Sequence, residues 1–183
     1  MKSNPLDLIH AAFARRGHEG YGEGVSQLDH ARQCGAFAER DGAPPALVAA
    51  AFLHDIGHLL HDLPQDVADN GIDTQHEASG SAWLSQYFGA EVTEPVRMHV
   101  AAKRYLASNE PGYFEQLSEA SKVSLRLQGG PLDAQQSREF EAQQFYADAV
   151  RLRRWDEEGK IVGYQGPDAR HFDSVVAACL KTP

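Results

Sequence analysis

The chain has 183 residues, of which 42% are hydrophobic and 23% are charged, and its formal net charge is −9. This length and composition predict a single soluble domain spanning 1–183, and the acidic balance argues against nonspecific binding to nucleic acid or anionic membranes. Because no segment has the apolar length of a membrane span or the continuous core of a signal peptide, a cytoplasmic protein is expected.

Apolar residues recur at helical spacing along nearly the whole chain, beginning with a segment at residues 6–16. Ser26 caps a second helix that runs to about residue 40, and Asp29 completes a capping-box pattern. The later helices are predicted at about 46–61, 75–88, 93–106, 118–127 and 133–155, with a last one after Pro167. Since no β-hairpin pattern or internal repeat is found, the predicted class is all-α. The cysteines, Cys34 and Cys179, are too few for a disulfide framework and are expected to be buried free thiols.

The most informative segment is the adjacent pair His54-Asp55 inside the apolar run 51–58. Neighbouring residues of a helix point about 100° apart, so this pair can share a metal ion only if the ion lies close against the helix. A carboxylate has two oxygens, so Asp55 could also bridge to a second ion. The alternative for a buried His-Asp pair is a satisfied hydrogen bond without any ligand.

Further candidate ligands lie at a distance along the chain. They are His30, His76, His99 and Asp156. Each histidine taken singly is more often structural, but together with His54 and Asp55 they form a nitrogen and oxygen ligand set that suits Fe, Mn or Zn. The residues alone leave open whether one or two ions bind, and whether the chemistry is hydrolysis or oxygenation.

His58 follows His54 by four residues, which predicts that both share one helix face and that His58 contacts substrate or orients a ligand. His61 continues this face at the expected helix end and is interpreted as a rim residue. Lys103 lies one turn after the candidate ligand His99. It is either a solvated lysine or an ammonium directed at a bound anion.

Arg153 is three residues before Asp156 and is the arginine of the 151–154 run that is expected to point inward. A guanidinium can bind a phosphonate or phosphate through two hydrogen bonds. The sequence therefore predicts an anion site beside the candidate metal ligands.

The order His30, His54-Asp55, Asp156 resembles the ligand pattern of the HD superfamily, whose members are all-α metalloproteins. The resemblance implies an HD-domain helical bundle with a dinuclear site. It assigns one metal to His30, His54, Asp55 and Asp156, and the other to His76, His99 and the bridging Asp55.

Six short segments carry a narrower resemblance, to the HD-domain mixed-valent di-iron oxygenases of organophosphonate breakdown. In chain order they read YGE, QLDH, HDIGH, HVAAKRYL, QGGP and RRWD. The resemblance implies two iron ions, Fe(II)/Fe(III), and O2-dependent cleavage of the C–P bond of 1-hydroxy-2-aminoethylphosphonate, as in 2-amino-1-hydroxyethylphosphonate dioxygenase. The products would be phosphate and glycine, and the partners are this small organophosphonate and O2.

The same resemblance assigns roles to single residues. Those implied in catalysis are His54, Asp55, His58 and Lys103, and those implied in substrate binding are Tyr21, Glu23, His58, Lys103, Ser121 and Arg153. Glu23 matches a carboxylate that occupies an iron position until substrate displaces it. The family has a tyrosine three residues before this glutamate, whereas Tyr21 is two residues before Glu23.

Three alternatives remain open at this point. The same chemistry on 1-hydroxy-2-(trimethylammonio)ethylphosphonate would give glycine betaine, and Tyr21 with Glu23 could serve either amine. The same framework also serves HD-type metal-dependent phosphohydrolases, many of which have lysine at the position of His58. The third alternative is a catalytically inactive regulatory module.

Overall fold

The computed structural model describes residues 4–21, 23–60 and 75–182, and over these residues the fold is all-α, as predicted. The α-helices are α1 Pro5–Arg16, α2 Gln27–Arg40, α3 Pro45–Leu53, α4 His76–Leu84, α5 Ala90–Asn109, α6 Tyr113–Gln116, α7 Glu119–Leu127, α8 Ala134–Glu141, α9 Tyr146–Glu158 and α10 Asp173–Ala178. Two short 3₁₀ helices accompany them, η1 Ile56–Leu59 and η2 Ala169–Phe172. No helix in the described part of the chain is long and apolar enough to cross a membrane.

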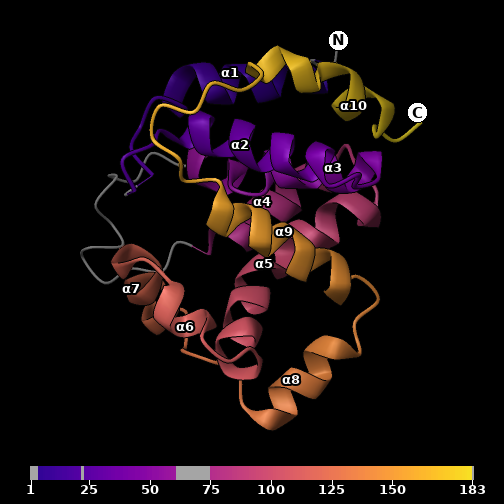
Figure 1. Ribbon diagram of the computed structural model, residues 1–183. Helices are drawn as coiled ribbons and strands as arrows, with labels where there is room; N and C mark the ends of the chain where they lie inside the picture. The colour runs from indigo at the N-terminus through magenta and orange to yellow at the C-terminus, as the bar shows by residue number, and fades with distance from the viewer. Residues whose placement is uncertain (1–3, 22, 61–74, 183) are drawn as a thin grey trace.

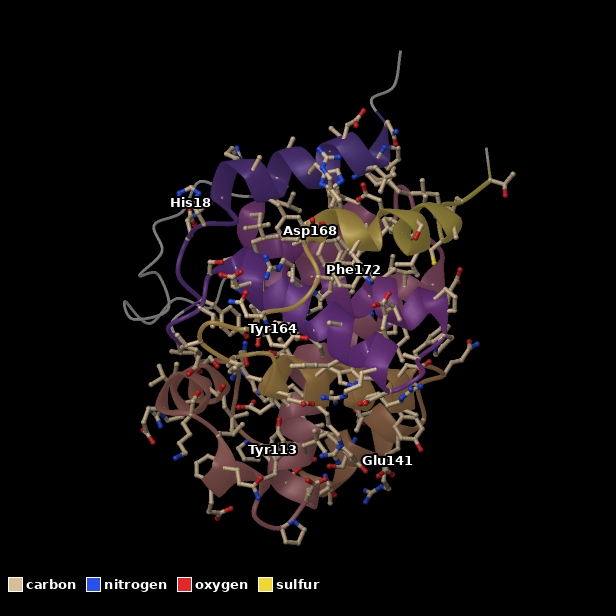
Figure 2. All side chains as sticks on the ribbon, turned by 45° about the horizontal axis from the view of Figure 1, so that its top comes forward. His18, Tyr113, Glu141, Tyr164, Asp168 and Phe172 are labelled. Atoms are coloured by element: carbon tan, nitrogen blue, oxygen red, sulfur yellow. The ribbon has the colours of Figure 1, made fainter. Side chains whose placement is uncertain are left out.

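The main core lies where α2 and α3 pack together and against α5 and α9, with α1 and α10 side by side at one end of the molecule (Figure 1). The alanines of α3 allow this close packing, since Ala49, Ala50 and Ala51 are fully buried. Phe172 fills the space under α10, stacking on Phe52 with 4.6 Å between ring centroids (Figure 2).

A second, smaller part of the molecule is built at the opposite end by α6, α7 and α8 around the C-terminal half of α5 and the start of α9 (Figure 1). Figure 2 shows Tyr113 in this part, well separated from Phe172. The long helix α5 extends through both parts and packs along α9. Residues near the middle of α5 therefore lie at the junction of the two parts.

The predicted helix over 46–61 is wrong in its second half, because α3 ends at Leu53 and a turn at His54 and Asp55 leads into η1. The imidazole Nδ1 of His54 lies 2.8 Å from the carbonyl oxygen of Ala51, which an α-helix would have paired with the amide of Asp55. The His54 side chain thus occupies the Ala51 carbonyl that the Asp55 amide would have used in a continuing helix. The helix therefore ends at the two candidate ligands, His54 and Asp55.

Other predicted boundaries also change. The helix over 133–155 is two helices, α8 and α9, with a break at 142–145 that allows both Phe140 and Phe145 to pack on the second part's core. The helix over 75–88 ends earlier, at Leu84, and α5 begins before Pro95 and contains it. Of the cysteines, Cys34 is a buried free thiol as predicted, whereas Cys179 is free but only partly buried.

Candidate metal centre

Four predicted ligands meet in a first cluster inside the main core. They are His30 on α2, His54 and Asp55 in the turn after α3, and Asp156 near the end of α9, and all four are buried. The Nε2 atom of His30 lies 3.2 Å from Nε2 of His54, 3.6 Å from Oδ2 of Asp55 and 3.4 Å from Oδ1 of Asp156. The Nε2 atom of His54 is 3.4 Å from the same Asp55 oxygen. Side chains from three separate elements therefore present their donor atoms to one point.

His76 and His99 form a second cluster on the other side of Asp55. Their Nε2 atoms are 3.1 Å apart, and they lie 3.3 Å and 3.5 Å from Oδ1 of Asp55. The two oxygens of one carboxylate thus face different clusters, Oδ2 toward His30 and His54 and Oδ1 toward His76 and His99. This is the arrangement of a carboxylate that bridges two ions.

Three of the imidazoles are oriented by the backbone. Nδ1 lies 2.8 Å from the Gly159 carbonyl in His30, 2.8 Å from the Ala51 carbonyl in His54 and 2.6 Å from the Val96 carbonyl in His99. A carbonyl only accepts, so Nδ1 donates the proton and Nε2 directs a lone pair into the cluster. This pattern is typical of histidines that ligate metal ions. For His76, Nδ1 lies 3.6 Å from Oε2 of Glu77.

The spacing and charge of these donors fit metal ions. Two donors about 2.1 Å from one ion and at right angles to each other lie about 3.0 Å apart, close to the separations within each cluster. Burial alone would raise the pKa of the Asp55 carboxyl, but His54 and its other imidazole neighbours hold it well below its usual range. For Asp156, burial is likewise outweighed by Arg153, His30 and His54, which lower its pKa. Two buried carboxylates are therefore ionised at neutral pH, Asp156 with Arg153 as a counter-charge and Asp55 with positive charge supplied at the imidazoles, either by protons or by metal ions.

The place of His58 differs from the sequence prediction. Because the helix ends at Leu53, His58 does not share a helix face with His54 but lies on η1, where its ring stacks on His76 with 4.0 Å between centroids. Gly57 makes this contact possible, since a Cβ atom there would be 2.0 Å from the carbonyl oxygen of His76. His58 thus borders the second cluster. His61 lies outside the described residues.

Lys103 and Arg153 lie buried beside the metal cluster, so the interpretation of Lys103 as a solvated lysine is wrong. The Lys103 ammonium donates to the Ser124 hydroxyl at 2.8 Å, and burial together with the charge of Arg153 lowers the pKa of Lys103 to about 7. Arg153 points inward as predicted and donates to Tyr113 at 2.9 Å and to the carboxylates of Asp156 and Glu157. Two basic groups therefore face the interior next to Asp156.

Lys103, Arg153 and a third basic residue that the sequence reasoning missed, Lys160, form what is here called the basic region. Ser121, at the start of α7, contacts this region. Its hydroxyl accepts a hydrogen bond of 2.9 Å from Lys160, which also contacts Glu157 at 3.1 Å and Glu23 at 3.5 Å. The sequence offered one signal for Lys160, its spacing of four residues from Asp156. Glu157, which pairs with both Arg153 and Lys160, was missed as well.

Tyr21 and Glu23 occupy different environments although they are two residues apart. The ring of Tyr21 stacks on His30 with 3.8 Å between centroids, and its hydroxyl donates to Oδ1 of Asp156 at 3.0 Å. Glu23 instead accepts from the Ser118 hydroxyl and pairs with Lys160. Tyr21 therefore covers the first cluster, and the contacts of Glu23 are with the basic region rather than with the ligands.

Fold and site together define the class: an all-α protein with a buried histidine–carboxylate centre, suited to two metal ions, beside buried basic groups. No family model matches the chain. It is 42% identical over 176 residues to [1-hydroxy-2-(trimethylamino)ethyl]phosphonate dioxygenase (glycine-betaine-forming) of Leisingera caerulea, covering 96% of this chain and 90% of that protein. It is also 42% identical over 167 residues to hydroxymethylphosphonate dioxygenase of Gimesia maris, covering 90% and 83%.

A third relative, an uncharacterized protein of Acanthamoeba polyphaga mimivirus, is 32% identical over 149 residues, covering 80% of this chain and 68% of that protein. The identity and coverage of the two named enzymes place this chain in their family. The chain belongs to the phosphonate dioxygenases.

Proposed function

We propose that this protein is an HD-type di-iron oxygenase that uses O2 to cleave the C–P bond of a 1-hydroxyphosphonate. The observation that carries the proposal is Asp55, whose two oxygens face separate histidine clusters in a buried centre. Iron suits this set of nitrogen and oxygen donors, which includes no thiolate among the proposed ligands. The names of the two relatives support oxygenase chemistry on a phosphonate that carries a hydroxyl group.

In this proposal His30, His54, Asp55 and Asp156 hold one iron, and His76, His99 and Asp55 hold the other. The second ion has fewer protein ligands, which leaves coordination positions for substrate and O2. The iron pair, when bound, supplies the activation of O2. The protein contributes a fixed donor geometry and excludes bulk water, because every one of these side chains is buried.

The basic region would bind the phosphonate group. The Lys103 ammonium is desolvated, so a neighbouring dianion stabilises its protonated form and the ion pair is stronger than it would be in water. Arg153 adds a fixed positive charge and at the same time orients the ligand Asp156. Ser121 offers a hydroxyl on the same side, and His58 borders the second cluster, where it can hydrogen-bond an oxygen of the substrate.

The substrate we propose first is 1-hydroxy-2-(trimethylammonio)ethylphosphonate, which would give glycine betaine and phosphate. The Leisingera caerulea relative named for this substrate supports it better than the primary amine and glycine expected from the sequence. The overall reaction balances with one O2: one oxygen atom completes the carboxylate at C1, the other replaces carbon on phosphorus, and one proton is released. The Gimesia maris relative, at equal identity, keeps hydroxymethylphosphonate in the test panel.

The test is anaerobic reconstitution with Fe(II), followed by oxygen-consumption and phosphate-release assays with the trimethylammonio, primary amine and hydroxymethyl compounds. We expect one phosphate for each O2 consumed, with the trimethylammonio compound giving the highest kcat/KM. Labelled ¹⁸O2 should place one label in phosphate and one in the carboxylate.

The matched controls are Asp55→Ala and the chelated wild-type protein, both of which should be inactive. Phosphate release from phosphate esters without oxygen uptake would contradict the proposal and favour a phosphohydrolase. Absence of oxygen consumption with the whole panel, in protein that retains both irons, would also overturn it.

A further inference from the structure

The backbone around Lys160 is fixed by α2, the helix that carries the ligand His30. The carbonyl of Gly159 accepts from His30 at 2.8 Å. Gln33, which is fully buried, makes two hydrogen bonds to the backbone of Ile161, at 3.1 Å to its carbonyl and 2.9 Å from its amide. Lys160 thus lies between two backbone contacts to the same helix, and its position is coupled to that of the first metal cluster.

The packing at Gly159 restricts this segment further. A Cβ atom on Gly159 would be 2.6 Å from Sγ of Cys34 and 3.0 Å from the carbonyl oxygen of Trp155. Cys34 is buried directly behind His30, with its sulfur 3.7 Å from Nε2 of that histidine. Position 159 therefore has room only for glycine. This packing fixes the direction in which the backbone continues from the end of α9 to Lys160.

The Lys160 side chain is directed into the site rather than toward solvent, with a relative exposure of 11%. Its ammonium contacts Ser121 at 2.9 Å, Glu157 at 3.1 Å and Glu23 at 3.5 Å. An ammonium group has three donors, and each has a partner here. It also lies 5.9 Å from the ring centroid of Tyr21, which covers the first cluster.

The charges around Lys160 explain how an anion could enter. Lys103, Arg153 and Lys160 bring three positive charges to one region, where Asp156, Glu157 and Glu23 pair with Arg153 and Lys160, and Lys103 donates to the neutral Ser124 hydroxyl. The carboxylates of Glu23 and Glu157 are partly exposed, so they can turn toward water when another anion arrives. A phosphonate would then take their place on Lys160 and keep its charge neutralised.

We propose that Lys160 is a substrate-binding residue of this site: its ammonium binds the phosphonate group together with Lys103 and Ser121, and it exchanges Glu23 or Glu157 for that anion. This assignment rests on the proposed function for the identity of the ligand. It adds a specificity determinant that selects substrates with a doubly charged anionic group. Neither Glu23 nor Glu157 would bind the phosphonate itself.

Methylphosphonate is the probe, because it has the anionic group and lacks the C1 hydroxyl that the reaction needs. Its binding to iron-loaded protein is measured by anaerobic calorimetry for wild type, Lys160→Met and Lys160→Arg. We expect Lys160→Met to weaken binding at least about tenfold, since the phosphonate then loses one ammonium partner, and Lys160→Arg to stay within about threefold.

Lys122→Met is the matched control, because Lys122 is also on α7's side of the site but pairs with the exposed Glu119 at 2.9 Å. It should bind methylphosphonate as wild type does. With a substrate found in the panel above, Lys160→Met should raise KM more than it lowers kcat. Iron content and melting temperature of all variants are measured alongside.

Binding by Lys160→Met within twofold of wild type, at full iron content, would overturn the assignment. Loss of iron in both Lys160→Met and Lys160→Arg would also overturn it, because it would show that Lys160 only supports the fold of the site. The two proposals fail separately. A wild type that binds methylphosphonate through Lys160 but consumes no O2 contradicts the proposed reaction alone.

Discussion

The metal cluster and the basic region beside it are held in place by different kinds of contact. In the cluster, His30, His54 and His99 are each fixed to a backbone carbonyl. In the basic region, Lys103 is fixed to a serine and Lys160 to a serine and two carboxylates. Backbone contacts change only when helices move, whereas side-chain contacts can be exchanged. The comparison indicates a preorganised cluster of candidate metal ligands next to a basic region whose side-chain contacts can be exchanged.

The largest effect is expected from Asp55→Ala, which removes the only carboxylate that contacts both clusters in the described part of the site. Both ions should be lost from the purified protein, with activity reduced by at least about three orders of magnitude. Metal content per chain measures this directly, and circular dichroism reports whether the fold is retained.

His76→Ala sharpens the same comparison, because it should release one ion and leave the first cluster loaded. Asp7→Ala, at an exposed position of α1, is the control for removal of an acid and should retain both ions. Full metal occupancy in Asp55→Ala would show that Asp55 does not bridge.

Two glycine substitutions should separate the clusters. Gly57→Ala would place a Cβ 2.0 Å from the His76 carbonyl, and Gly159→Ala would place one 2.6 Å from Sγ of Cys34. Each should destabilise the protein by about 1–3 kcal/mol through overpacking. Gly57→Ala should weaken only the ion at His76 and His99, whereas Gly159→Ala should weaken the ion at His30 and also phosphonate binding.

Thermal unfolding and metal titration of the two variants check this separation. Gly89→Ala is the control, because the atoms nearest to its Cβ are the flexible carboxylate oxygens of Glu91. Equal loss of both ions in both variants would mean that the clusters form one cooperative unit.

Most helices could be predicted from the sequence, because apolar spacing and caps are local signals. Ser26 does cap α2, accepting from the amide of Asp29 at 3.0 Å. The end of α3 could not be predicted, since it depends on the His54 side chain and on the approach of η1 to α4. The break between α8 and α9 has neither glycine nor proline and follows from tertiary packing of Phe140 and Phe145.

For the site, the sequence could indicate the candidate ligands, which the structure brings together, because their residue types and order are unusual together. Its only signal for Lys160 was the four-residue spacing from Asp156, and it gave none for Glu157, because the contacts of both residues depend on where Gly159 ends α9 and on Ser121 and Glu23. Lysines and glutamates are common on surfaces, so composition gives no reason to select these two. The backbone-fixed half of the site was therefore the more predictable half.

Lys103→Met should affect substrate binding and leave the metal cluster intact. Removing one buried ammonium from an anion site costs about 1.5–3 kcal/mol, which corresponds to a rise in KM of roughly 10- to 150-fold. Iron content should stay at the wild-type level, and Lys103→Arg should recover part of the affinity. Loss of iron in Lys103→Met would instead assign Lys103 a structural role.

The same residue predicts a pH dependence. Burial and Arg153 lower the pKa of Lys103 to about 7, so the free protein loses this charge as pH rises through 7. An anion binds the protonated form, so binding takes up a proton above pH 7, and affinity should fall by up to about tenfold per pH unit. Methylphosphonate affinity between pH 6 and 9 measures it. Lys103→Arg keeps its charge and therefore takes up no proton, whereas the phosphonate titrates in the same way with both proteins. The difference between the wild-type and Lys103→Arg pH profiles is therefore due to Lys103. Parallel profiles would contradict the prediction.

The smallest effect is expected from Tyr21→Phe, which keeps the stacking on His30 and removes only the hydrogen bond to Asp156. A hydrogen bond to a charged group contributes about 1.5–3 kcal/mol, but Arg153 still holds Asp156, so the loss should stay below about 1.4 kcal/mol and metal affinity should fall by less than about tenfold. If Tyr21 positions the ligand, Tyr21→Phe weakens the first ion slightly and leaves the rate of substrate binding unchanged. If Tyr21 gates the site, the variant binds methylphosphonate faster at full iron content, because the hydrogen bond that closes the gate is gone. Stopped-flow binding together with iron content distinguishes the two, and the stacking of the Tyr21 ring on His30 favours positioning.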